Sequence, residues 1–291
     1  MHSRTLPRPG QWTQQYWINF QQIHYTKGGN VKLMVNKKTQ QQWWEEKWKE
    51  REDILRSVFG ETYPPGMVTS FFWDDFDSMV PGGCALVFPP RTPFRENWLV
   101  ITHGLTQPLS AKEVAGVDMP SGYGYEFGFL ANDNPAWAPE ALQQLLTYVM
   151  QSGTPIERGH RVPMGFFPHA SNIITPELGK IPEEANHHPL GEMRAVLFWP
   201  YMSYPRGFSS STGYFSILLG TTITQTEWNM AKATSSAHLL LLLFKAGIGQ
   251  ISDLLRPTVT NKKRWASEWQ SIRCLPEEEV EQLLLEYATL D

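Results

Sequence analysis

The sequence predicts an α+β fold in which a mixed central β-sheet is flanked by helices, with extensions at both ends of the chain. Short apolar runs alternate with Pro/Gly breaks through the middle of the chain, as strands do. Segments with helical spacing of apolar residues lie on both sides of these runs. No internal repeat and no low-complexity linker divides the chain, so one main domain is expected.

The composition is that of a globular protein. The chain has 291 residues, of which 41% are hydrophobic and 19% charged, and its net charge is −4. These values exclude a disordered or collagen-like chain. The slightly negative net charge also gives no overall electrostatic attraction for nucleic acid. Cys84 and Cys274 fit no zinc-finger spacing and are too few for a disulfide framework. The chain shows no secretory signal and no apolar run of membrane length, so a cytoplasmic protein is expected.

The first half of the chain predicts a helix followed by strands. Residues 38–59 carry apolar residues near helical spacing, and Gly60 follows as a C-cap. The turn sequence TKGGN at 26–30 predicts a hairpin before this helix. Strands are predicted at residues 67–73, 84–89, 97–105 and 123–131.

The second half predicts helices around two buried strands. One helix begins near Pro139 and ends at Gly153, with a stripe at Leu142, Leu145, Leu146 and Val149. Residues 154–191 are rich in Pro and Gly and are expected to be irregular. The remaining predictions are strands at 195–202 and 214–223 and helices at 226–246 and 276–288.

Charge is distributed unevenly between the two ends of the chain. Residues 1–44 contain six Lys or Arg and no acidic residue, whereas the last sixteen residues contain six acidic residues and no basic one. The basic segment also carries aromatic rings, so it could contact nucleic acid as an arm. The alternatives are a solvated edge of the protein or an arm that docks on the acidic end. Six charges over 44 residues are sparse, so nucleic acid is not expected as a partner. No membrane is expected either, because no apolar run is long enough to span one.

Motifs that carry catalysis are mostly absent from the sequence. There is no GxSxG elbow, Walker A loop or HExxH pattern, so no catalytic residue, metal or cofactor is expected. Glu126 lies inside the aromatic strand 123–131 and either faces solvent or is paired, but we do not expect it to be catalytic. The alternative is a metal-dependent hydrolase that uses histidines of the irregular region, although their spacing fits no common zinc pattern. These histidines are His160, His169, His187 and His188.

Four sequence blocks, in order, resemble the suppressor of fused family. They are NWLVITHGLTQ (97–107), PSGYGYEFGFLA (120–131), WAPEALQQLLTYVMQSG (137–153) and ERGHRV (157–162). They are similar to the family's GLS turn, its PSG strand, its W-x₄-LQ helix and the GH or GDH step after that helix. The resemblance covers roughly residues 40–260. It divides the chain into a basic aromatic extension (1–37), a suppressor of fused-like domain (38–260) and an acidic helical tail (261–291).

The resemblance implies a non-enzymatic domain that masks a partner protein. Animal members hold a peptide as an added strand between this domain and a second domain, which residues 261–291 are too short to form. This chain is therefore similar to the shorter bacterial members, some of which are thought to be immunity proteins that neutralise polymorphic toxins. By position in the motifs, Tyr148 and His160 are the candidate partner contacts, although no aspartate precedes His160. Tyr148 is equally consistent with a helix residue beside the core stripe, and His160 with an ordinary loop histidine.

Overall fold

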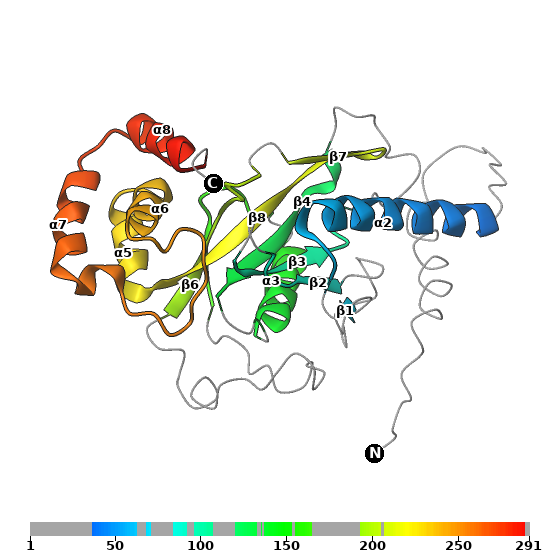
Figure 1. Ribbon diagram of the computed structural model, residues 1–291, viewed down its shortest axis with the longest axis horizontal. Coiled ribbons are helices and arrows are strands. Elements are labelled where there is room, and N and C mark those ends of the chain that lie inside the picture. The colour runs from blue at the N-terminus through cyan, green and yellow to red at the C-terminus, as the bar shows by residue number, and fades with distance from the viewer. Residues whose placement is uncertain are drawn as a thin grey trace, which may run out of the picture.

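The computed structural model describes most of the chain after its first thirty-six residues (Figure 1). The predicted hairpin at 26–30, the first 36 residues of the basic extension, and His169, His187 and His188 lie outside the described residues. Within the described part, no helix is long and apolar enough to cross a membrane. The described ranges are 37–62, 68–70, 84–91, 96–106, 120–132, 135, 137–152, 155–164, 193–204 and 207–288.

Eight strands in the described residues form one mixed sheet, in the order β1-β2-β3-β4-β8-β6-β5, with β7 paired to β8. Neighbouring strands are antiparallel, except for the central pair of β4 and β8, which is parallel. The strands are β1 (Val68–Ser70), β2 (Cys84–Phe88), β3 (Trp98–His103), β4 (Pro120–Ala131), β5 (Arg161–Pro163), β6 (Met193–Pro200), β7 (Phe208–Ser210) and β8 (Gly213–Thr224). The predicted mixed sheet with flanking helices is confirmed.

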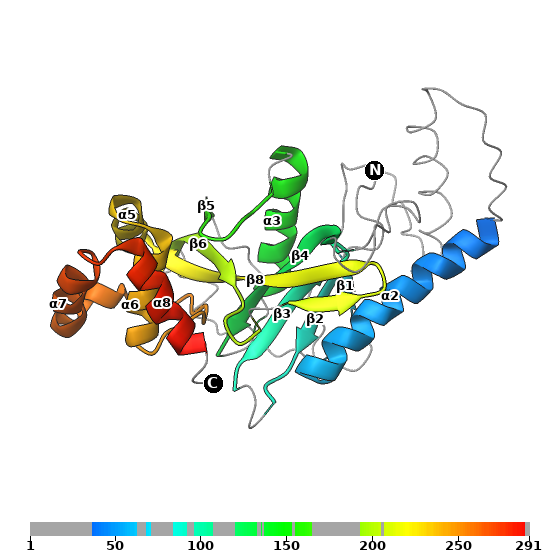
Figure 2. The ribbon, with the colours of Figure 1, turned by 90° about the horizontal axis from the view of Figure 1, so that it is seen from above.

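Helices cover both faces of this sheet. Helix α3 (Ala138–Ser152) packs its predicted stripe on one face, against Phe127 and Phe129 of β4. Helix α2 (Lys37–Phe59) packs Leu55 and Phe59 on the opposite face, as the view from above shows (Figure 2). Alternation of side chains along the strands supplies an apolar layer to each face, so both helices bury their apolar sides.

The predicted helix at 226–246 is wrong as a single element. The structure has α5 (Gln225–Ala233) and α6 (Ser236–Lys245), separated at Thr234 and Ser235. The Ser235 side chain accepts a hydrogen bond from the His238 backbone N–H, so it caps the start of a new helix. The spacing of apolar residues continues across this position, which is why the sequence predicted one helix.

The end of the chain packs on α6. Helices α7 (Lys263–Ile272) and α8 (Glu277–Ala288) bury Trp269, Ile272, Val280 and Leu284 in one cluster with the leucines of α6. The predicted helix at 276–288 is confirmed, whereas α7 and the short strands β5 and β7 were not predicted. Three-residue strands carry too few residues to show a period, so only pairing with β6 and β8 defines them.

Candidate functional site

The candidate contacts lie where α3 leads into the edge strand β5. Within α3, Leu145 and Val149 are buried, while Tyr148 lies on the outward side and is 46% exposed. Helical geometry explains this, because Tyr148 lies about 100° around the helix from Val149, which is near the middle of the buried stripe. The helix therefore leaves the Tyr148 ring about half exposed to solvent.

The segment 155–160 is fixed to the sheet by main-chain hydrogen bonds. Ile156 is buried, and its N–H donates to the Tyr125 hydroxyl at 3.2 Å. The Gly159 N–H donates to the Phe198 carbonyl, and the Phe198 N–H donates to the His160 carbonyl, both at 2.8 Å. Gly159 has a φ of +81°, a left-handed conformation that glycine adopts without strain. His160 is therefore displayed from a rigid backbone.

The His160 ring is oriented by its own turn. Its Nδ1 accepts a hydrogen bond from the Glu157 backbone N–H at 3.1 Å. In the neutral ring the proton then resides on Nε2, which lies 3.8 Å from a Glu157 carboxylate oxygen. Both side chains are exposed. The arrangement presents an N–H donor and a carboxylate side by side.

Strand β5 forms one edge of the sheet, and no other described residue pairs with its outer side. Val162 lies opposite Val196, and the Met164 N–H donates to the Arg194 carbonyl. Because hydrogen bonding alternates along an antiparallel pair, the polar backbone groups of Arg161 and Pro163 point away from β6. Proline has no N–H, so this edge offers one donor and two acceptors.

Two arginines join this edge to the C-terminal helices. The Arg158 guanidinium lies 4.3 Å from the Trp199 ring centroid and pairs with Glu281 of α8. The Arg161 guanidinium donates to the Ala231 carbonyl at 2.7 Å and to the Ser236 hydroxyl at 3.2 Å. Both positive groups are thereby held on the side of the sheet that carries α5–α8.

Glu126 is fully buried. The alternation of residues along the predicted strand had left open whether this side chain faces solvent or is paired. Its carboxylate accepts hydrogen bonds from the Thr102 and Thr106 hydroxyls at 2.6 and 2.7 Å. It also accepts from the backbone N–H groups of Gly104 and Thr106. Burial raises the pKa of Glu126, while these hydrogen bonds oppose the rise. The residue ties the end of β3 to β4 and is not a surface group.

A second buried polar group lies on the inner side of α2, near Glu126. Arg51 is 0% exposed and donates to the Thr212 hydroxyl at 3.2 Å. Burial lowers its pKa to about 10, so it stays charged at neutral pH. Its Nε and Nη2 and both ring nitrogens of buried His103 lack hydrogen-bond partners in the described part of the chain. Nothing in the local sequence pattern indicated this cluster, because its members come from separate elements.

The hydrolase alternative finds no support in the structure. Among the described residues there is no group of three or more His, Cys, Asp or Glu side chains that could hold a metal ion. His160 is the one member of the proposed histidine set that the structure describes, and its ring is engaged by a backbone N–H.

These features define the class of the protein, an α+β domain built on one open mixed sheet. The chain belongs to the suppressor of fused family, since the family model described as suppressor of fused protein matches residues 83–257. This family is one of protein-interaction domains. No curated protein sequence matches the chain.

Three solved structures are similar to this chain at low sequence identity, and the first two share its fold. A chain of the Sufu–Fu complex crystal structure is 12% identical, with a TM-score of 0.54, over 80% of this chain and 97% of that one. The Drosophila Suppressor of Fused crystal structure is 14% identical, with a TM-score of 0.52, over 77% of this chain and 54% of that one. A putative suppressor of fused homolog from Neisseria gonorrhoeae is 18% identical, with a TM-score of 0.47, over 74% of this chain and 97% of that one.

Proposed function

We propose that this protein masks a partner protein by accepting a segment of it as an added strand along the outer edge of β5. The observation that carries the proposal is the outward-facing backbone of Arg161 and Pro163, which directly follows exposed His160. Exposed Tyr148 lies on α3, the helix that leads to this edge. Main-chain hydrogen bonds give such an added strand its affinity, and neighbouring side chains give it specificity.

The register of the added strand follows from this edge. A partner residue opposite Arg161 both donates to and accepts from its backbone, while the Pro163 carbonyl accepts one further hydrogen bond. The Tyr148 ring supplies apolar area with a polar end, which suits a binding contact. The Sufu–Fu complex, whose Sufu-like fold this chain shares, supports a protein as the kind of partner.

More specifically, the proposed function is that of a bacterial-type immunity protein, and the partner is a toxin. The first 44 residues have a net charge of +6, so residues 45–291 have a net charge of −10 within the total of −4. A basic toxin would complement this negative charge. The proposed location is the cytoplasm, in keeping with the free thiols of Cys84 and Cys274. The function is binding, with no catalytic step.

The test is a native pull-down with the tagged full-length chain. We expect one stoichiometric partner that survives high salt and is lost from the Tyr148→Ala/His160→Ala double variant. Tyr214→Ala is the matched control, because Tyr214 is also 46% exposed but lies on β8. If the double variant retained its partner as well as Tyr214→Ala does, the proposed site would be wrong.

The toxin form has a separate readout. The purified partner should damage its target in the absence of this protein and lose that activity when an equimolar amount is added. If the partner is an active toxin and this protein leaves its activity unchanged, the immunity role is excluded. The strand-addition site is tested separately, by the pull-down with the Tyr148→Ala/His160→Ala variant.

A further inference from the structure

Arg161 lies at the middle of the strand-addition edge and offers it both backbone and side-chain groups. Its backbone N–H and carbonyl point away from β6, as the alternation along the antiparallel pair requires. An added strand therefore places one of its residues directly opposite Arg161. Because residues opposite one another share a face of the sheet, the side chain of that residue lies on the same face as the Arg161 guanidinium.

The Arg161 guanidinium is held in a fixed position by neutral groups of α5 and α6. Its Nη1 donates to the Ala231 carbonyl at 2.7 Å and to the Ser236 hydroxyl at 3.2 Å. The Trp228 ring centroid lies 5.7 Å from its Cζ. The side chain is half-buried. The cation is thus oriented before a partner binds, which lowers the entropy that binding would cost.

No carboxylate of the described part of the chain forms an ion pair with this cation. Its Nε and Nη2 also have no hydrogen-bond acceptor among the described residues. Arg158, the neighbouring arginine, differs because it pairs with Glu281. The carboxylate of Glu157 lies beside the His160 ring instead. The edge therefore displays one positive charge whose remaining donors are open to a partner.

The neighbouring positions of an added strand meet apolar side chains. Val162 and Met164 belong to the apolar cluster that α3 covers. Their side chains alternate with that of Arg161 along the chain, so they lie on the opposite face of the sheet. Residues on either side of the one opposite Arg161 would extend this apolar layer. The edge is thus complementary to a strand with one polar position between apolar ones.

We infer that the partner segment carries an Asp or Glu side chain opposite Arg161, between two apolar residues, and that Arg161 fixes the register of the added strand. The inference rests on the proposed strand addition and names the chemistry of its partner. A guanidinium and a carboxylate form charge-assisted hydrogen bonds that are stronger than those between neutral groups. A shift of one residue would turn the carboxylate toward the apolar face, so only one register satisfies both faces.

One carboxylate in the inserted segment is compatible with a partner of positive overall charge. The net charge of residues 45–291 acts on the whole partner during its approach. Arg161 acts only on the side chain placed opposite it. The two effects therefore select different properties of the partner, its total charge and the sequence of its bound strand.

The test selects peptides that bind the full-length protein from a displayed library of random heptapeptides. We expect enriched peptides with Asp or Glu at one position between two apolar residues. A synthetic peptide from this set should bind about fivefold to tenfold more tightly than the same peptide with the acidic residue replaced by its amide. Edge-binding peptides without this acidic preference would overturn the inference and leave strand addition in place.

Variants of Arg161 assign the preference to this side chain. Arg161→Gln should remove the difference between the acidic peptide and its amide, whereas Arg161→Lys keeps the charge and should retain a preference. Arg161→Glu should reverse the preference in favour of a lysine at the same peptide position. A preference for the acidic peptide that persists in Arg161→Gln would overturn the inference.

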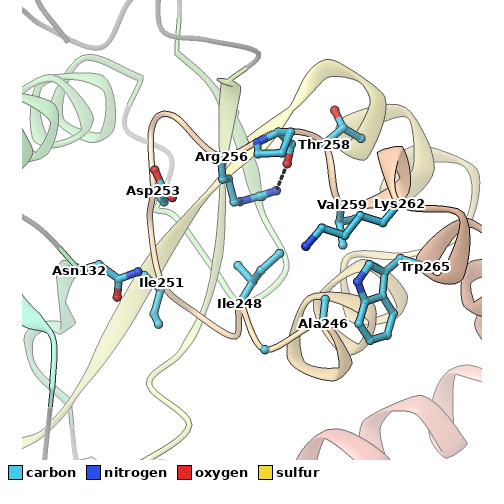
Figure 3. Close-up of a pocket in the computed structure, with 12 residues that line it drawn as sticks. Asn132, Ala246, Ile248, Ile251, Asp253, Arg256, Thr258, Val259, Lys262 and Trp265 are labelled. Carbon is cyan, nitrogen blue, oxygen red and sulfur yellow. Dashed lines mark hydrogen bonds between the residues drawn. The ribbon is translucent and has the colours of Figure 1, made fainter. Parts of the chain in front are cut away.

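Arg264→Gln is the matched control and should keep the full preference. The Arg264 guanidinium also lies over a tryptophan ring, 4.5 Å from the Trp265 centroid. Trp265 borders a pocket between the segment after α6 and the start of α7 (Figure 3), and none of the residues that line this pocket belongs to β5. The control therefore removes a similar cation at a place remote from the edge.

Failure of the proposed function has a different signature. Peptides that add as a strand should lose binding to the Tyr148→Ala/His160→Ala double variant, as the partner protein does. If no peptide were enriched, or if every enriched peptide bound this variant unchanged, the strand-addition site itself would be wrong. The inference about Arg161 would then fall with it.

Discussion

Acid should destabilise this protein through His103. The residue lies at the end of β3, is 1% exposed, and contacts the Trp48 ring at 4.1 Å between centroids. Burial, followed by the nearby Arg51 charge, lowers its pKa from 6.5 to about 3. The other ionisable groups of the cluster are the Glu126 carboxyl and the Cys84 thiol, whose pKa values burial raises. His103 is therefore neutral in the folded protein at every pH above about 3.

The sign and the size of the effect follow from this shift. Between about pH 3 and pH 6.5 the unfolded chain binds a proton at His103 and the folded chain does not. Stability from this group is thus present above pH 6.5 and is lost as the pH falls toward 3. At about pH 5 the loss amounts to about 2 kcal/mol of unfolding free energy. The raised pKa of Glu126 acts in the opposite direction, because its contribution falls as the pH rises above 4.5.

The assay isolates His103 by comparing proteins. His103→Phe keeps an aromatic ring against Trp48 and removes the titrating group. Urea unfolding should show that the free-energy difference between the unaltered protein and this variant changes by about 2 kcal/mol between pH 7.5 and about pH 5. Cys84→Ala is the control, because burial raises the pKa of that thiol well above 9 and its effect should not vary over this range. A His103→Phe difference that is equally constant with pH would refute the argument.

Three further substitutions test packing and polar contacts. Gly220→Ala places a Cβ 2.7 Å from a ring carbon of Phe129 and should cost about 1–3 kcal/mol, measured by thermal unfolding. Glu227→Gln leaves the buried Arg256 guanidinium without its anion and should cost about 3–5 kcal/mol in urea. Thr224→Ala removes the side chain that caps α5 through Glu227 and should cost about 1 kcal/mol by the same measurement.

Matched controls separate these effects from general damage. Glu268→Gln breaks a surface pair with Lys245 and should change stability by less than about 1 kcal/mol. Thr226→Ala, an exposed threonine of the same helix, should change it by less than about 0.5 kcal/mol. Losses at Glu227 or Thr224 no larger than those of their controls would show that these contacts do not stabilise the fold. A Gly220→Ala protein as stable as the unaltered one would show that the packing around Gly220 has room for a methyl group.

Much of the fold could be predicted because its signals are local. The helix at 38–59, the stripe of α3 and the five longer strands can all be recognised from patterns among neighbouring residues, and the structure has them. The break at Ser235 could not be predicted from periodicity, because the apolar spacing continues across it and only a side-chain cap ends the run. Strand β5 was missed for a related reason, since three residues define it only through their pairing with β6.

The sequence by itself determined the class of fold, the order of its main elements and the resemblance to the suppressor of fused family, because each depends on patterns within short segments. The tertiary structure decided which polar groups are buried and which surfaces stay open. Glu126 meets Thr102 across 24 residues of chain and Thr106 across 20, and Arg256 meets Glu227 across 29. Such contacts form when distant segments exclude water together, and no local pattern encodes their partners.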